Sequence, residues 1–319
     1  MTEAVIGTSI ARAANYLLAS KLVAIPTETV YGLAGNALDA GAVVNIFEAK
    51  GRPRFDPLIV HVPSWEKALE YVADVPPDAD KLARKFWPGP LTLLMKKGGT
   101  IPAIVTAGLE SVGIRCPDHP LTLTLLRSIP FPLAAPSANS FGYVSPTTAA
   151  HVKHQLGRKI PYILDGGPCR VGIESTIIGW EEGNPFIYRL GGISVEQVEA
   201  IIGSVQVKPS SSRPQAPGQL DRHYAPMKPF YFGDIETIIR QHKIKSPGVL
   251  SFREYRPRYR WSFVLSPDGD LHEAARNLFG FLRELDQSDV DAVVAEPVPD
   301  LGLGRAINDR LRRAAFRHP

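Results

Sequence analysis

Hydrophobic and polar positions along the chain switch repeatedly between a helical and a strand period up to about residue 204. Apolar residues recur with helical spacing over 9–20, and the apolar run over 21–26 predicts a short buried strand. Further helices are predicted at 42–49, directly after the N-cap residue Ser64, and in a segment that ends at Phe86. Ser145-Pro146 predicts the start of another helix, and the capping box of Ser194 and Gln197 predicts the start of the last one in this part of the chain. Further strands are predicted at 58–62, 91–95, 112–115, 132–135, 162–164 and 176–180. This mixture indicates an α/β or α+β domain over residues 1–205.

Residues 206–229 interrupt this pattern. Five prolines and a serine triplet leave the segment without periodicity, which is typical of a linker. Its second half nevertheless places a cation, an imidazole and a phenol side by side at Arg222, His223 and Tyr224. Over 230–319 the expected order is strands at 248–252 and 261–265, a helix at 271–286, a strand at 291–295 and a helix at 303–316. That alternation predicts a small βαβ-type domain with a partly parallel sheet.

Composition is that of an ordinary globular protein. The 319 residues suffice for two cores, and the net charge of +4 is compatible with nucleotide or RNA ligands without requiring them. The two cysteines, Cys116 and Cys169, form no CxxC pair and are interpreted as reduced thiols. The N-terminal segment lacks the charged-then-apolar order of a signal peptide, and no apolar stretch approaches a membrane span. We therefore expect a cytoplasmic protein without a membrane partner.

The run Lys50-Gly51-Arg52-Pro53-Arg54 places three cations in five residues, ahead of an apolar stretch that ends at His61. Because glycine and proline break a helix, the cations are predicted on a loop that leads into a buried strand. Lysine supplies a compact charge and arginine a planar fork, and both suit phosphate oxygens. A solvated basic turn is the alternative, and the motifs elsewhere in the chain favour a polyanion site.

Two polar segments follow predicted strands, where a rigid element can hold them. Residues 26–33 bring two threonine hydroxyls, a carboxylate and a phenol, and residues 135–140 bring Ser137 and Asn139. The latter pair can bond a phosphate or an adenine edge, although a Ser- and Asn-rich turn is equally common. Arg115 and Arg189 either pair with a surface acid or clamp a substrate carboxylate.

Several other chemistries find no support in the sequence. Ser137 has no GxSxG context, the eight histidines form no HExxH pattern, and neither GxGxxG nor a P-loop is present in the C-terminal segment. No protein-held metal is therefore expected. Mg²⁺ stays compatible with the chain, because it arrives with substrate phosphates and needs few protein ligands.

The ordered motifs PTETVYGL, KGRPRFDPLIVH, VGIRCPDHP, APSANSFG, GIESTII and YRLGGIS resemble the YrdC/Sua5 family of L-threonylcarbamoyladenylate synthases. RHYAP, followed by LGLGRAINDRLRRAA, resembles the two-domain Sua5 branch. The resemblance implies a YrdC-like twisted mixed-sheet domain, a linker that acts as an active-site lid, and a small Rossmann-like C-terminal domain. It also implies a reaction in which L-threonine, bicarbonate (or CO₂) and ATP give threonylcarbamoyl-AMP and pyrophosphate. A separate transferase then uses this product for t6A modification of adenosine 37 in tRNA.

The family pattern also implies residue roles. Lys50 and Arg52 are expected to be catalytic and, with Arg189, to hold the phosphates. The other implied nucleotide contacts are Asp56, Ser111, Ser137, Asn139, Ser145, Arg222, His223 and Tyr224. The implied threonine contacts are Thr29, His61, Arg115, Ala135 and Ser175, with Arg115 on the carboxylate. Either Thr29 or His61 is expected to read the threonine hydroxyl, since an unpaired buried polar group would reject valine.

Two positions depart from the family pattern. Asp56 stands where the family often has Asn, and its charge would repel phosphates unless Arg54 or Mg²⁺ pairs with it. The linker reads APGQLDRHYAP where the family commonly has SPGMKYRHYAP, so no contact is predicted for Gln219 or Leu220.

Two other functions compete with this interpretation. An RNA-binding module would use the basic face without adenylating activity, although the chain has no RNP-type aromatic motif. A carbamoyl-adenylating enzyme of hydrogenase maturation would carry acylphosphatase and zinc-finger-like segments, which this sequence lacks. The sequence leaves open whether tRNA contacts this chain.

Overall fold

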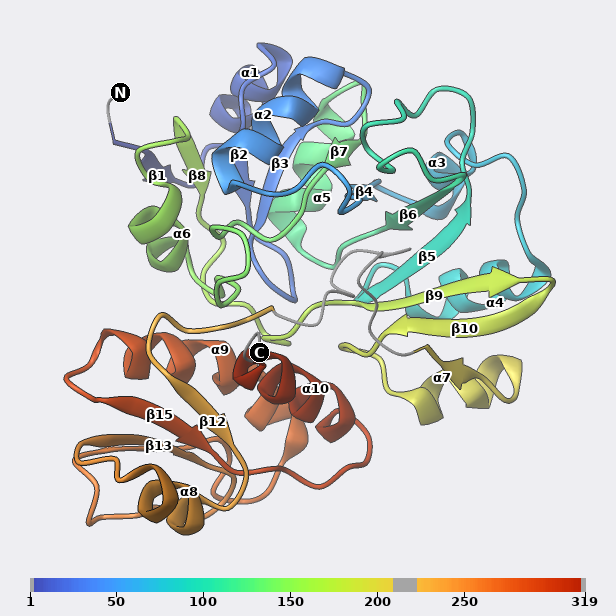
Figure 1. Cartoon of the computed structure of the whole chain (residues 1–319). Coiled ribbons are helices and arrows are strands. Elements are labelled where there is room, and N and C mark those ends of the chain that lie inside the picture. Colours follow the sequence, from blue (N-terminus) through green and yellow to red (C-terminus); the bar gives the residue numbers. More distant parts are fainter. Residues whose placement is uncertain (1–2, 209–222, 317–319) are drawn as a thin grey trace.

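The computed structural model describes residues 3–208 and 223–316, which form two α/β units (Figure 1). The first unit contains a strongly twisted mixed sheet. Its strands, in spatial order, are β1 (Val5–Gly7), β8 (Tyr162–Leu164), β2 (Val23–Ile25), β3 (Gly32–Asn36), β7 (Leu133–Ala134), β4 (Ile59–His61), β6 (Ser111–Arg115), β5 (Leu91–Lys96), β9 (Thr176–Glu181), β10 (Asn184–Arg189) and β11 (Gln206–Val207). β11 lies inside the segment interpreted as a linker and pairs with β10.

Within the described residues, the helices of the first unit are α1 (Ile10–Leu18), α2 (Ala40–Lys50), α3 (Trp65–Leu69), α4 (Pro77–Phe86), α5 (Pro120–Ser128), α6 (Ala149–Leu156) and α7 (Val195–Ile202). Five of these seven helices begin with a side-chain cap, and the other two, α4 and α5, begin with a proline. Ser64 caps α3 as predicted, and Ser194 and Gln197 form the predicted capping box on α7. The helix predicted from Ser145-Pro146 was wrong by one turn: Thr148 accepts from the His151 amide, and α6 begins at Ala149.

The register of the sheet brings distant motifs to one edge. β4 and β6 are parallel, with His61 opposite Arg115 at their carboxyl ends. A bridge between Gly32 and Ser137 places the 26–33 loop against the 135–140 loop. Since carboxyl ends of neighbouring parallel strands meet at the same edge, these polar side chains converge.

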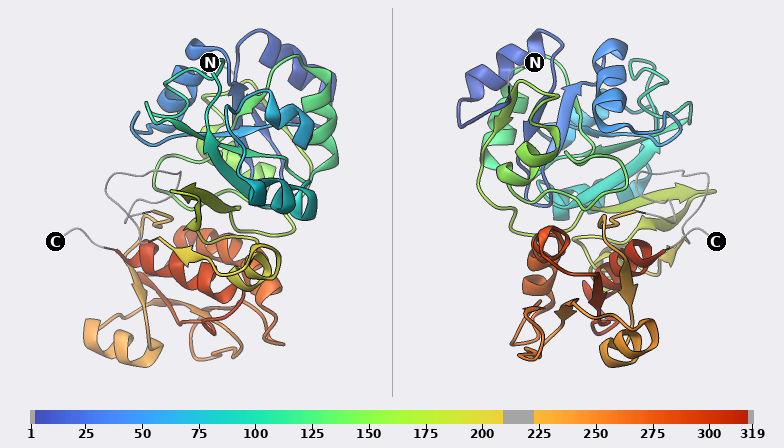
Figure 2. Two further views of the ribbon diagram at one scale, coloured as in Figure 1. Left: turned by 90° about the vertical axis from the view of Figure 1, so that its right-hand side faces the viewer. Right: turned by 60° about the vertical axis from the view of Figure 1, so that its left-hand side comes forward.

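The C-terminal unit is built on a four-stranded sheet in the order β12 (Phe230–Phe232), β15 (Ala292–Ala295), β13 (Pro247–Ser251) and β14 (Trp261–Val264). All of its strand pairs are parallel, rather than only some of them. Its helices are α8 (Ile235–His242), α9 (Leu271–Gln287) and α10 (Gly304–Ala315). Helices α9 and α10 lie between this sheet and the first unit (Figures 1 and 2).

The two units share a continuous apolar core. Val30, Tyr143 and Ile173 of the first unit belong to the same buried cluster as Leu278 and Phe279 of α9. Gly172 makes the closest approach: its φ is +82°, and a Cβ there would lie 2.3 Å from the Cα of Arg276. Only glycine fits this contact, so the backbone of the loop before β9 rests directly on α9. No helix in the described parts of the chain is long and apolar enough to cross a bilayer.

Candidate active site

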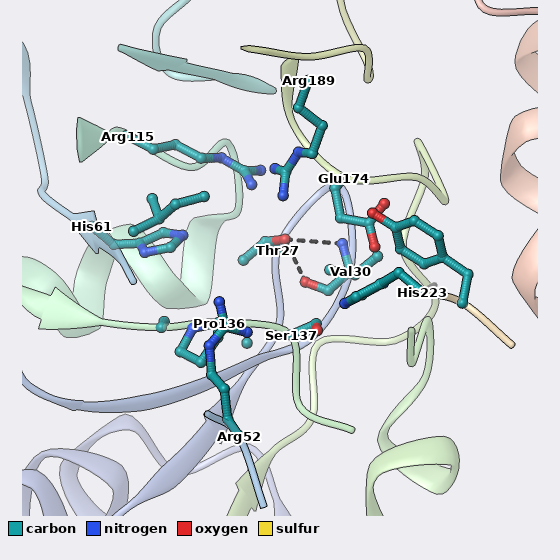
Figure 3. A pocket seen from close by; sticks show the side chains of 14 residues that line it. Thr27, Val30, Arg52, His61, Arg115, Pro136, Ser137, Glu174, Arg189 and His223 are labelled. Atoms are coloured by element: carbon teal, nitrogen blue, oxygen red, sulfur yellow. Dashed lines mark hydrogen bonds between the residues drawn. The ribbon is translucent and has the colours of Figure 1, made fainter. Parts of the chain in front are cut away.

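A polar pocket lies at the converging edge of the large sheet (Figure 3). It is lined by Thr27, Val30, Gly32, Arg52, Ile59, His61, Arg115, Ala135, Pro136, Ser137, Glu174, Arg189, His223 and Tyr224. Its free volume is about 50 Å³, whereas sites for drug-sized ligands measure roughly 300–1,000 Å³. A nucleotide therefore enters only if part of this wall moves, and His223 and Tyr224 are the part of the wall that belongs to the segment 206–229.

Lys50 connects two of the predicted motifs. It is the last residue of α2, and Gly51 ends the helix in the left-handed conformation with φ 63°. The Lys50 Nζ donates hydrogen bonds to the carbonyl oxygens of Ser137 at 2.5 Å and Asn139 at 2.6 Å. Burial and the neighbouring Arg52 lower the pKa of Lys50 well below its ordinary value. One buried lysine thus holds the loop after α2 and the 135–140 segment together.

Arg52 forms a buried ion pair with Asp56, with 2.9 Å between Nη2 and Oδ2. Its Nη2 also donates to the carbonyl of Pro57 at 2.8 Å. The carboxylate of Asp56 was expected to pair with Arg54 or Mg²⁺. In the structure Arg54 is exposed, and Arg52 is the partner of Asp56. Burial raises the pKa of Asp56, and the charge of Arg52 opposes that rise.

The opposite side of the pocket carries Arg115, the last residue of β6. Its Nη2 lies 2.7 Å from Glu28 Oε1 and donates to Thr29 Oγ1 at 2.9 Å. Arg115 and Glu28 are 5% and 1% exposed, so this pair is shielded from water. Beside it, burial and Arg115 lower the pKa of His61 to about 3, and the imidazole is therefore neutral at physiological pH. An arginine, a hydroxyl and a neutral imidazole together suit a small zwitterion with a hydroxyl group.

Arg189 and Glu174 complete the wall nearest the C-terminal unit. The Arg189 Nη2 donates to Ser175 Oγ at 2.9 Å, and Ser175 in turn bonds Thr92. Glu174 Oε1 accepts from Ser145 Oγ at 2.6 Å. Figure 3 shows Arg115 and Arg189 reaching into the pocket from one side and Arg52 from the other.

Eight of the sixteen predicted site residues line this pocket: Arg52, His61, Arg115, Ala135, Ser137, Arg189, His223 and Tyr224. Lys50, Asp56, Thr29, Ser145 and Ser175 bond lining residues without lining the pocket themselves, and Asn139 bonds Lys50. Ser111 lies apart from both groups. Ser111 is at the amino end of β6, so four residue steps of about 3.3 Å separate it from Arg115. It lines a separate groove together with Trp180 and Tyr188. Arg222 lies outside the described residues.

Several residues at or behind the pocket were not among the predicted ligand contacts. Thr27 and Val30 line it within the PTETVYGL motif, and the hydroxyl of Thr27 donates to the Val30 carbonyl at 2.6 Å. Arg310 reaches Glu174 from α10, a helix that contains four arginines, of which Arg310 and Arg313 are buried. The local sequence carries no signal that distinguishes these two from Arg305 and Arg312.

The twisted sheet carries a pocket whose arginines suit phosphate oxygens on one side and a small carboxylate on the other. A family model described as telomere recombination (Sua5/YciO/YrdC) matches residues 15–191, and one described as threonylcarbamoyl-AMP synthase, C-terminal domain, matches residues 193–316. The chain is 42% identical to the threonylcarbamoyl-AMP synthase of Pyrococcus abyssi, with 95% of this chain and 93% of that protein covered. It is also 42% identical to the synthase of that name from Bacillus subtilis, with 96% and 92% covered.

Among solved structures, P. abyssi Sua5 complexed with L-threonine superposes with a TM-score of 0.92 at 40% identity. That match covers 99% of this chain and 97% of the other. The chain therefore belongs to the Sua5/YrdC family of threonylcarbamoyl-AMP synthases, as the sequence motifs predicted, and it is an enzyme of the two-domain type.

Proposed function

We propose that the pocket condenses L-threonine, bicarbonate (or CO₂) and ATP into threonylcarbamoyl-AMP and pyrophosphate, for t6A modification of tRNA. One observation carries the proposal: Arg115 and His61 line one side of the same cavity that Arg52 lines on the other. Thr29 supports the first side through its bond to Arg115, and Lys50 supports the second through its bond to the Ser137 carbonyl. The chain matches a threonine-complexed structure over 99% of its length, which supports assigning the first group to threonine.

In this proposal, the carboxylate of threonine binds the guanidinium of Arg115, and the hydroxyl bonds Thr29 or His61. The amine condenses with bicarbonate to give a carbamate and water, and the carbamate oxygen attacks the α-phosphorus of ATP while pyrophosphate leaves. Arg52, Lys50 and Arg189 neutralise charge on the phosphates, so positioning and electrostatics supply the rate without an enzyme nucleophile. Closure of the pocket by His223 and Tyr224 keeps water from the adenylate.

The substrate is proposed to be MgATP. No cluster of three or more His, Cys, Asp or Glu side chains suited to a metal occurs within residues 3–208 and 223–316. The carboxylate of the cation loop, Asp56, is already engaged by Arg52. The ion is accordingly proposed to be held mainly by ATP oxygens and water. Delivery of the product to a separate transferase is part of the same proposal.

The test is pyrophosphate release with each amino acid supplied singly, with and without bicarbonate. We predict release that requires both threonine and bicarbonate and is far slower with valine. Arg115→Ala should raise the KM for threonine on the order of hundredfold, because it removes a buried charge partner of the carboxylate. Arg170→Ala is the matched control, since Arg170 is an exposed arginine that pairs with Asp118.

Because Arg115→Ala leaves Glu28 buried without its partner, the double variant Glu28→Gln/Arg115→Ala should be assayed beside it. A loss that persists in the double variant assigns the effect to threonine binding. Release that ignores threonine would overturn the proposal, and salt-dependent tRNA binding without ATP turnover would favour the RNA-binding module instead.

A further inference from the structure

Asp286 is a carboxylate of the C-terminal unit that bonds two segments of the chain next to the pocket. It lies in the last turn of α9. Its Oδ2 accepts a hydrogen bond from the Tyr143 hydroxyl at 2.6 Å, and its Oδ1 accepts one from the Lys228 amide at 2.9 Å. Asp286 is not among the described residues that line the pocket. It can therefore act on the site only through the two segments that it bonds.

Tyr143 belongs to the loop over residues 140–145, which follows Asn139 and is 9% exposed at the tyrosine. The Nδ2 of Asn139 donates to the Tyr143 carbonyl at 2.8 Å. The Asn139 carbonyl in turn accepts from the Nζ of Lys50 at 2.6 Å. A short series of hydrogen bonds thus connects Asp286 with Lys50, a cation that we assign to the phosphates.

Lys228 belongs to the segment 223–228, whose first two residues line the pocket. The Ala225 amide of this segment donates to the Gly142 carbonyl at 2.9 Å, which joins the segment to the same loop at one point. The carboxylate of Asp286 joins the two at a second point. Two points of attachment restrict the orientation of the segment as well as its distance from the loop.

We propose that Asp286 is a positioning residue for ATP in the reaction proposed above, on which this inference rests. Its carboxylate holds the 140–145 loop and the 223–228 segment together, and thereby sets the distance between the pocket wall and the cations assigned to the phosphates. Loss of Asp286 should therefore weaken the use of ATP. Threonine recognition should be spared, because Arg115 and His61 are held by β6 and β4 within the first unit.

The test compares Asp286→Ala with Glu284→Ala, which removes an exposed carboxylate from the same helix. Arg283 still bonds the carbonyls of Val144 and Ser145 in both variants, so the loop stays attached to α9. We expect Asp286→Ala to raise the KM for ATP on the order of tenfold, because two hydrogen bonds to a carboxylate are lost. The KM for threonine should change less than about twofold. Glu284→Ala should leave both constants at the wild-type values.

Asp286→Asn tests whether the bonds or the charge of Asp286 matter. The amide oxygen of asparagine can accept from the Lys228 amide while its Nδ2 donates to the Tyr143 hydroxyl, which accepts as well as donates. We therefore expect Asp286→Asn to keep the KM for ATP near the wild-type value. Adding Tyr143→Phe to Asp286→Asn removes the acceptor of that Nδ2 and should raise the KM for ATP again. Adding Tyr143→Phe to Asp286→Ala should change nothing further, since that bond is already lost.

Hydrogen exchange of the Ala225 amide, followed by NMR, reports the position of the 223–228 segment without any substrate. The acceptor of this amide is Gly142 rather than Asp286, so faster exchange shows that the segment itself has moved. We expect faster exchange in Asp286→Ala than in Glu284→Ala, and a return to the wild-type rate in Asp286→Asn. Equal exchange in the two alanine variants would overturn the inference.

Equal KM values for ATP in Asp286→Ala and Glu284→Ala, or parallel rises for ATP and threonine, would overturn it as well. If Asp286→Ala does not fold, Asp286→Asn with and without Tyr143→Phe decides the question in the same way. Failure of the proposed function looks different, since the wild-type enzyme itself would then show no threonine-dependent pyrophosphate release. ATP affinity measured by calorimetry then replaces the KM, and equal affinities in the two alanine variants would refute the role of Asp286.

Discussion

Two sets of buried arginines surround the pocket, and they differ in what they face. Arg52 and Arg115 belong to the first unit, line the pocket, and pair with carboxylates of that same unit. Arg283 and Arg310 belong to the C-terminal unit, are at most 1% exposed, and do not line the pocket. They bond groups of the first unit instead: Arg283 donates to the carbonyls of Val144 and Ser145, and Arg310 donates to Glu174.

This difference separates arginines that can bind the ligand from arginines that hold the pocket loops in position. The first set presents guanidinium groups to the cavity, where substrate phosphates or a carboxylate can share them with the resident acids. The arginines of the second set donate hydrogen bonds across the boundary between the units, and so hold the loops that carry Ser145, Glu174 and Tyr224. Substitutions in the first set should therefore lose a ligand contact, whereas substitutions in the second set should misplace a loop. Double variants that remove both partners of an ion pair can distinguish these two causes of lost activity.

The largest effect is expected for Arg52→Met. It leaves Asp56, which is 0% exposed, without a charge partner, and the loss of one partner of a buried pair costs about 3–5 kcal/mol of unfolding free energy. Chemical denaturation measures this cost. Arg52→Met/Asp56→Asn should restore most of the stability, because the buried charge is gone, but not ATP turnover, because the phosphate ligand is gone as well.

That outcome sharpens the comparison with Arg310, which pairs with Glu174 but does not line the pocket. Turnover that recovers in Arg52→Met/Asp56→Asn would place Arg52 among the arginines that only position other groups. It would also remove the cation loop from the proposed chemistry.

A smaller effect is expected for Asp56→Asn alone. The carboxylate lies beside the cations that are assigned to the phosphates, so its removal should tighten ATP binding by about threefold to tenfold. Calorimetric titration with ATP measures the change, and Asp118→Asn is a control on an exposed carboxylate that pairs with Arg170. Weaker ATP binding in Asp56→Asn, with an unchanged melting temperature, would show instead that Asp56 is needed to orient Arg52.

The regular elements of this molecule were largely predictable from the sequence, because local signals specify them. The capping residues Ser64 and Ser194 and the apolar run at 162–164 mark elements that the structure contains. Strand β3, Gly-Leu-Ala-Gly-Asn, was not predicted, because it has no β-branched residue and its glycines are selected by close packing. Ser145-Pro146 resembles a helix start, but the segment is held as a loop by Arg283, which is 138 residues away.

The site residues likewise divide into those with a local sequence signal and those that depend on tertiary contacts. The motifs of the first unit indicated the cations and hydroxyls that face the ligand, because those residue types reveal their chemistry directly. The partners of those residues depend on tertiary structure and left no local signal. Asp56 could have paired with Arg54 by proximity in sequence, yet packing buries Arg52 against it and leaves Arg54 exposed. Arg310 is one of four arginines on α10, and only docking of the two units places it against Glu174.

The smallest expected effect concerns the proton on Lys50. Burial and Arg52 lower its pKa, and bound phosphates would raise that pKa again, so ATP binding should take up a fraction of a proton. The sign follows: ATP affinity should increase as the pH falls toward the lowered pKa of the free enzyme. Calorimetry in two buffers of different ionisation enthalpy, at about pH 8–9 where ATP itself does not titrate, measures the uptake.

Lys50→Arg is the matched variant for this experiment, because its guanidinium keeps a positive charge throughout that range. The uptake should disappear in Lys50→Arg and persist in Lys159→Arg, since Lys159 is exposed and bonds the carbonyl of Ala49. Absence of uptake in the wild type would mean that the carbonyls of Ser137 and Asn139 already hold Lys50 as an ammonium. Lys50 would then resemble the arginines of the first unit, because it would already carry its positive charge before ATP binds.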